Sequence, residues 1–240
     1  MRFNDRTVKK IGDLLRVLNE QLDDDSHIWF RGQSNSSWPL VPGLGRSASE
    51  PAAEMALIKR FKQNAVPHLS SKPASEWEWL FLMQHYRLKT RLLDWSESPL
   101  ASLFFAASSQ SSDDAALWCL DPVALNKHAN INFAHSLEIP AFDHDEILKN
   151  YLPSTIARET TSDLPPIAAI AARNSPRIAA QLGTFTISHR KFTPIEEVSD
   201  KKHVWRMIIP GRAKPTINGV RSISQIRYQH RPQFAFIERW

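Results

Sequence analysis

The sequence predicts an α+β fold, a single domain with a mixed or largely antiparallel sheet flanked by helices. Helical and strand patterns follow one another without a regular β-α-β repeat. The 240 residues, 42% of them apolar, can bury one full core. The seven glycines form neither a Walker loop nor a dinucleotide fingerprint. We therefore expect one domain over residues 1–240, with a helical N-terminal part at 1–27, a core at about 28–210 and a basic C-terminal flank at 201–240.

The first expected elements are a helix and a strand. Residues 6–22 predict an amphipathic helix, because apolar residues recur at three- and four-residue steps: Val8, Ile11, Leu15, Leu18 and Leu22. Residues 28–33 (IWFRGQ) form a short aromatic run that enters a loop rich in Ser, Asn and Pro. They predict a strand with Arg31 at its end.

Three helices and a strand are expected next. Residues 52–65 are rich in alanine and have apolar residues in helical register. Ser75 and Glu78 form a capping box, which starts a second helix. The Ser-Pro pair at 98–99 starts a third, which is apolar on nearly all sides and should be buried. Residues 115–120 then predict a central strand.

The second half of the chain is less regular. Residues 122–174 contain short helical fragments broken by four prolines, and we expect irregular structure or an insertion there. The remaining expected elements are a helix at 175–182, strands at 184–188 and 203–210, a helix at 217–226 and a strand at 233–237.

Cysteine content and hydropathy limit the class of protein. The single cysteine, Cys119, excludes an intramolecular disulfide framework and a Cys-rich zinc site. Neither a signal peptide nor an apolar segment of about 18 residues is present, so we expect a cytoplasmic protein without a membrane partner. We also predict no metal site, because the spacing of the candidate ligands matches no standard pattern; these are His128, His135, Asp143, His144 and Asp145.

Basic residues are concentrated at the C-terminal end. Residues 1–150 carry 16 Lys/Arg and 19 Asp/Glu, whereas residues 151–240 carry 14 and 6. Such an end attracts phosphates of a nucleotide or of a nucleic acid, although it could equally be a solvated face. Because prolines interrupt the basic residues, we expect at most weak, sequence-independent nucleic-acid binding.

Two segments carry more polar groups than a core needs: Trp29–Gln33 (WFRGQ) and Gln84–Trp95 (QHYRLKTRLLDW). Together with Ser98-Pro99-Leu100 and Phe104-Phe105-Ala106, they resemble the signature of the FRG domain family, named for its aromatic-Arg-Gly motif. A later set resembles a third family motif: Arg177, Gln181, Gly183 and Phe185. The chain departs from the family at Arg87 and Lys89, where Gly and Pro are common. Some family members lie near prokaryotic defence genes, which implies a defence- or toxin-associated module, including phage defence.

The order of elements also resembles the mono-ADP-ribosyltransferases, and this resemblance implies NAD as a cofactor. It assigns the pyrophosphate to Arg31 with Gly32 and Gln33, the hydroxyl position to Thr90, Ser96 or Ser98, and the ribose hydroxyl to Gln181 or Glu238. The implied reaction is ADP-ribosyl transfer or NAD cleavage through an oxocarbenium-like state. Within the second segment, His85 and Tyr86 are candidate catalytic residues, and Arg91 and Asp94 are candidate cofactor ligands.

Other interpretations of the same residues stay open. Arg91 and Asp94 could form a buried ion pair that fixes a turn, and His85 and Tyr86 could be hydrogen-bonded core groups. The tryptophans are expected to be packing anchors rather than base-stacking platforms: Trp29, Trp38, Trp77, Trp79 and Trp95. A non-enzymatic nucleotide- or nucleic-acid-binding module and a purely structural interaction domain are the rival functions. We expect one shared site to contain the side chains of Arg31, His85, Tyr86, Arg91 and Asp94, because polar groups clustered in apolar segments are costly unless paired or functional.

Overall fold

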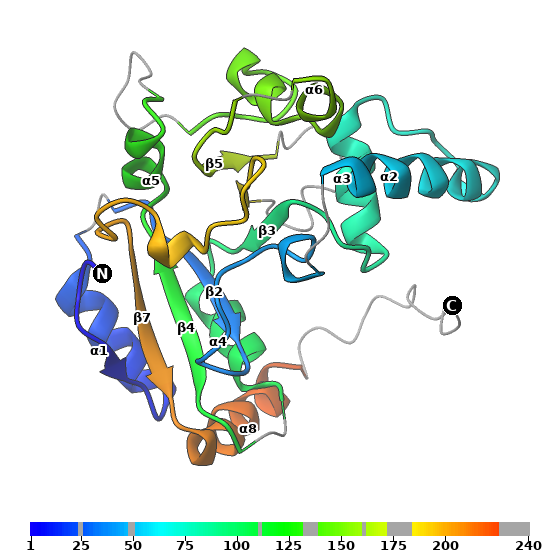
Figure 1. Cartoon of the computed structure of the whole chain (residues 1–240). Helices are drawn as coiled ribbons and strands as arrows, with labels where there is room; N and C mark the ends of the chain where they lie inside the picture. The colour runs from blue at the N-terminus through cyan, green and yellow to red at the C-terminus, as the bar shows by residue number, and fades with distance from the viewer. Residues whose placement is uncertain are drawn as a thin grey trace.

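Helices surround two small sheets in the computed structural model of the chain (Figure 1), which confirms the α+β class. The structure describes residues 1–23, 26–47, 51–109, 112–131, 139–159, 162–171 and 184–225. Among these residues, no helix is both long enough and apolar enough to cross a lipid bilayer.

The first sheet contains four strands in the order β1-β7-β4-β2. These are β1 (Arg6–Thr7), β7 (Val204–Ile209), β4 (Ala115–Leu120) and β2 (Trp29–Gln33). β1 runs parallel to β7, and the other pairs are antiparallel. Every residue of β4 is buried, as expected for a central strand, and it includes Cys119, whose thiol pKa is raised by burial.

The second sheet contains three antiparallel strands in the order β3-β6-β5. These are β3 (Leu92–Trp95), β6 (Thr184–Ile187) and β5 (Ile167–Ile170). An antiparallel bridge joins the sheets, because Phe30 and Ser96 exchange two backbone hydrogen bonds of 2.7 and 2.8 Å. β2 and β3 therefore lie side by side where the two sheets meet (Figure 1).

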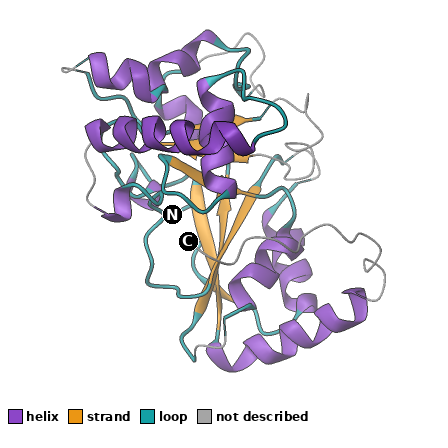
Figure 2. Ribbon diagram, turned by 90° about the vertical axis from the view of Figure 1, so that its right-hand side faces the viewer, coloured by secondary structure: helices purple, strands orange, loops and turns teal. Residues whose placement is uncertain are grey.

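Helices cover the outer faces of both sheets, and the strands lie between the groups of helices (Figure 2). One face of the first sheet packs against α1 (Ile11–Gln21), α4 (Pro99–Ala107) and α8 (Lys214–Gln225). The outer face of the second sheet packs against α2 (Pro51–Ala65) and α3 (Glu76–His85). The inner faces share a third apolar cluster that contains Trp29, Trp95 and Trp118. The shorter helices are α5 (Pro122–His128) and α6 (Pro153–Arg158).

Capping residues begin two of these helices as the sequence predicts. The Ser75 hydroxyl accepts a hydrogen bond from the backbone N–H of Glu78 at the start of α3, and Ser98 does the same for Ala101 in α4. The reciprocal bond of the expected capping box differs, because the Glu78 carboxylate accepts from the backbone N–H of Ala74 instead of Ser75.

Gly32 allows α4 to approach β2 closely. A Cβ atom at this position would lie 2.0 Å from the backbone oxygen of Ser102 and 2.6 Å from the backbone nitrogen of Ala106. Only glycine leaves room for such contact between a helix and a strand. Gly32 thus lies within the strand, opposite Leu117, and the strand continues past Arg31, which we expected to end it.

Several expected boundaries are wrong. The helix expected at 6–22 begins only at Ile11. The buried side of this helix consists of Leu14, Val17 and Leu18, so Leu15, which we expected on that side, is exposed. Residues 122–174 are not simply irregular, since they supply β5 to the second sheet.

Two surface positions also differ from expectation. α4 is not buried all round, because Phe105 is 70% exposed, and Trp38 is 48% exposed instead of packed. The other four tryptophans named above are buried, as predicted. The helix expected at 175–182 and the strand expected at 233–237 lie outside the described residues.

Candidate functional site

Arg31 is the centre of the candidate site. Arg31 is the middle residue of β2, whereas we expected it to end the strand. Because side chains alternate along a strand, the Arg31 side chain lies on the same face as Trp29, which is the face toward the second sheet. Its Nη1 donates a hydrogen bond of 2.6 Å to the backbone oxygen of Asp94 on β3. Its Nε is buried and has no hydrogen-bond partner among the described residues. Desolvation lowers the pKa of Arg31 to about 10, and the nearby Asp94 carboxylate opposes this shift.

Asp94 faces the end of α3. Its Oδ2 lies 3.4 Å from Nε2 of Gln84, which also donates to the backbone oxygen of Leu92 at 3.1 Å. The residue is exposed, yet desolvation by surrounding protein atoms raises the pKa of its carboxyl group, while Arg31 acts to lower it. A carboxylate that solvent reaches and that protein atoms partly desolvate is suited to contact a ligand.

Arg46 adds a second cation near Arg31. Its charge helps to lower the pKa of Arg31, and its Nε donates to the backbone oxygen of Val41 at 2.9 Å. The residue is exposed. With Arg31 and Arg46 as two guanidinium groups and the carboxylate of Asp94 beside Arg31, the site has a local positive charge, which favours an anion such as a phosphate. Arg46 was not predicted as a site residue, because the short Gly45–Ser47 segment around it has no distinguishing sequence pattern.

Gln33 and Thr90 have structural partners. The Gln33 side chain accepts a hydrogen bond of 2.8 Å from the indole of Trp118 and donates to the backbone oxygen of Pro39 at 3.3 Å. Thr90 is buried, and its hydroxyl accepts from the backbone N–H of Leu92 at 3.3 Å. Both side chains thus satisfy buried groups.

Arg91 does not share the site with Arg31, and the predicted ion pair with Asp94 is wrong. Its partner is Glu54 on α2, and both side chains have no exposure to solvent. The Arg91 Nε donates to Glu54 at 2.7 Å, Nη2 also donates to Glu54, and Nη1 donates to the backbone oxygens of Ser188 and His189. Every guanidinium nitrogen therefore already donates to the protein.

Neighbouring candidates lie around the junction with different roles. Ser96 forms the bridge to Phe30, and the Ser98 hydroxyl caps α4. His85 and Tyr86 are exposed at the end of α3, so they are not core groups; their rings meet edge to face with centroids 5.3 Å apart. Gln84 immediately before them contacts Asp94, which connects this end of α3 to the site.

Gln181 and Glu238 lie outside the described residues, as do Arg177 and Gly183.

Two basic residues of the C-terminal flank form contacts within the chain. Arg206 forms an ion pair with Asp5 at 3.0 Å and lies over the Trp118 ring, and Lys214 is buried and donates to the backbone oxygen of Ser34. These two cations are therefore not part of a solvated phosphate-binding face.

The candidate metal ligands of the sequence do not gather at one place among the described residues. His128 instead lies near Asp200 and His203, which the sequence analysis did not select. No spacing pattern could reveal this group, because a long segment of chain separates His128 from the other two.

Comparison with known proteins identifies one family. The FRG domain family model matches residues 26–115, so this part of the chain is an FRG domain. The matched segment includes β2, β3 and the helices α2 to α4, and hence Arg31, Asp94 and Gln84, and it ends at the first residue of β4. No curated protein and no solved structure matches the chain.

Proposed function

We propose that the junction of the two sheets binds a nucleotide through its phosphates, with Arg31 as the main anion ligand, and that the chain acts on NAD or a related nucleotide. The observation that carries the proposal is the Arg31 side chain. It is largely desolvated, its Nη1 donates a hydrogen bond to the backbone oxygen of Asp94, and its buried Nε has no partner among the described residues. A buried charged donor without an acceptor is costly unless a ligand supplies one.

The charges around Arg31 support a phosphate as that ligand. Arg46 adds a second guanidinium, and a guanidinium matches phosphate oxygens with paired N–H donors. In this proposal Asp94 and Gln84 face the sugar of the nucleotide, because a carboxylate accepts hydrogen bonds from ribose hydroxyls. The Gln84 Oε1, which has no hydrogen-bond partner within the described part of the chain, can do so as well.

The proposed reaction is the loss of nicotinamide. The bond between C1′ of the ribose and the nicotinamide nitrogen breaks, and nicotinamide leaves as a neutral molecule with the bonding electron pair. The oxocarbenium-like ribose then bonds to the oxygen of water, or to a nucleophilic atom of an acceptor, which releases a proton. In this proposal the Asp94 carboxylate, which lies close to Arg31, stabilises the positive charge of the oxocarbenium-like ribose. Transfer to an acceptor in a defence or toxin role is part of the same proposal.

The binding half is tested by calorimetry of the purified chain with ADP-ribose. Arg31→Lys keeps the charge and removes the paired donors, so we expect an affinity loss of about 10- to 100-fold with little change in melting temperature. The matched control is Arg16→Lys on the exposed face of α1, which should bind as the unmodified chain does. Equal affinity of Arg31→Lys and the control would refute the binding site.

The catalytic half is tested by incubation with labelled NAD, scoring nicotinamide release and label transfer. Asp94→Asn should reduce turnover strongly while the affinity for ADP-ribose changes by no more than a few fold, because an amide stabilises an oxocarbenium ion less well than a carboxylate. Binding of ADP-ribose without any turnover of NAD would overturn the reaction and leave a nucleotide-binding module.

A further inference from the structure

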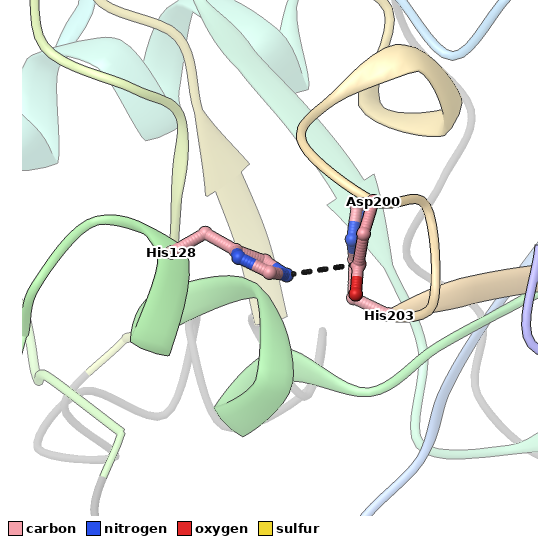
Figure 3. Close-up of side chains that lie close together, drawn as sticks. All are labelled: His128, Asp200 and His203. Carbon is pink, nitrogen blue, oxygen red and sulfur yellow. Dashed lines mark ion pairs between the residues drawn. The ribbon is translucent and has the colours of Figure 1, made fainter.

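Three side chains that could ligate a metal ion meet at the end of the first sheet, away from Arg31 in the sequence and on different elements. His128 is the last residue of α5, and Asp200 and His203 lie on the turn that leads into β7. One ligand atom from each lies within 4.8 Å of the others. Figure 3 shows His128 reaching across toward Asp200 and His203.

His203 has an unused nitrogen at this point. The residue is fully buried, and its Nε2 lies 2.8 Å from the backbone oxygen of Ile195, to which only a protonated nitrogen can donate. The proton on Nε2 leaves a lone pair on Nδ1, and this buried atom has no hydrogen-bond partner among the described residues. A histidine whose second nitrogen is held by a backbone oxygen is the usual arrangement of a metal ligand.

His128 is held in a similar way. Its Nδ1 lies 3.0 Å from the hydroxyl oxygen of Ser199, which can accept a hydrogen bond from a protonated Nδ1, and its Nε2 faces Oδ1 of Asp200 at 3.4 Å. Neighbouring ligand atoms of a tetrahedral zinc ion with bonds of about 2.0–2.1 Å lie about 3.3–3.4 Å apart. The separation of His128 and Asp200 already equals this value.

The charges nearby are compatible with a cation. Asp200 accepts a backbone hydrogen bond from Lys202 at 3.0 Å, and the Lys202 ammonium lies 3.9 Å from its other oxygen on an exposed, extended side chain. Asp121 on the neighbouring strand end also lies close to His203, and its charge is paired with Arg2 at 3.0 Å. Lys202 can move into solvent when a metal ion binds, because its side chain is 78% exposed.

We infer that His128, Asp200 and His203 bind a divalent transition-metal ion, with Zn²⁺ as the ion that this ligand set suits best. Two imidazoles and one carboxylate leave the fourth position of a tetrahedral ion to water or to a group from another molecule. This site reverses the expectation, drawn from ligand spacing, that the chain binds no metal. It does not depend on the proposed nucleotide site.

The experiment is calorimetric titration of Zn²⁺ into the full chain after treatment with a chelator. We expect one Zn²⁺ per chain, and a loss of affinity of more than about tenfold for both His128→Ala and Asp200→Asn. These residues are partly exposed, so both variants should fold, which circular dichroism checks. His144→Ala is the matched control, because His144 is exposed and outside the group.

A second measurement uses Co²⁺, whose visible absorption is intense in a tetrahedral site. The Co²⁺ spectrum of the unmodified chain and of His144→Ala should agree, and that of Asp200→Asn should be weak. Zn²⁺ binding at below one ion per chain, or equal affinity in the unmodified chain, His128→Ala and Asp200→Asn, would overturn the assignment.

Discussion

Replacing Glu54 with alanine removes the carboxylate that holds Arg91 in the core. The Arg91 side chain would then keep its hydrogen bonds to the backbone oxygens of Ser188 and His189, at 3.1 and 2.9 Å, but it would lose its ion-pair partner. Both residues are fully buried, so water cannot replace the lost partner without disturbing the packing. Breaking a buried ion pair in this way costs about 3–5 kcal/mol of unfolding free energy.

Urea denaturation measures this cost. With an m-value of about 3 kcal/mol/M, the midpoint should fall by about 1–2 M. Glu146→Ala is the control, because Glu146 forms an exposed pair with Lys149 and should change the unfolding free energy by less than about 1 kcal/mol.

The double variant Glu54→Leu/Arg91→Met separates the pair from the space it occupies. Since it leaves no buried charge, it should be more stable than Glu54→Ala. If Glu54→Ala unfolded at the same urea concentration as the control, Arg91 would not depend on Glu54, and its assignment as a structural residue would be wrong.

Three further results are expected. Gly32→Ala should destabilise the chain by about 3 kcal/mol or more in thermal unfolding, because its Cβ would collide with the α4 backbone, whereas Gly12→Ala in α1 meets nothing within 4 Å and should stabilise it slightly. Burial lowers the pKa of His189, although Asp163 opposes this, so the contribution of the neutral imidazole to stability is complete above about pH 6.5. It is lost as the pH falls toward the lowered pKa, by at most about 1.4 kcal/mol per pH unit. In urea denaturation between pH 5 and 7.5, the unfolding free energy of His189→Gln should therefore change less with pH than that of the unmodified chain. Arg206→Ala should lower the melting temperature and leave the salt dependence of any binding to duplex DNA unchanged, because Arg206 is engaged with Asp5; a shallower log–log slope in fluorescence anisotropy would contradict this.

The class of fold and most of the longer elements could be predicted from the sequence. The helices with clear caps and the strands β2, β4, β6 and β7 have strong local patterns. β3 and β5 do not, because a four-residue Leu-Leu-Asp-Trp run and an Ile-Ala-Ala-Ile run have no alternation that distinguishes a strand from a helix. Both become strands through pairing with β6, which local sequence does not encode.

The site was only partly predictable for a similar reason. Arg31 and Asp94 could be selected because they are charged residues within apolar segments. The partner of Arg91 could also have been found, since Glu54 shares one face of α2 with Ile58 and Phe61 and an acid on an apolar face needs a buried cation. The meeting of His128 with His203 depends on the pairing of β4 with β7, which no spacing rule predicts.

The pairing of β7 with both β4 and β1 has a consequence for how the chain folds during synthesis. β4 ends at Leu120, and its partner β7 begins only at Val204, so the apolar edge of β4 stays without that partner while the ribosome adds the intervening residues. At the usual rate of translation this interval lasts about 4–17 s. β1 stays without its partner still longer, because its Arg6 pairs with Met207 of β7. Such long-range pairing slows folding and leaves strand edges open to other chains. The FRG domain segment at 26–115 lacks β6 and β7, and expressed alone it should therefore aggregate instead of folding.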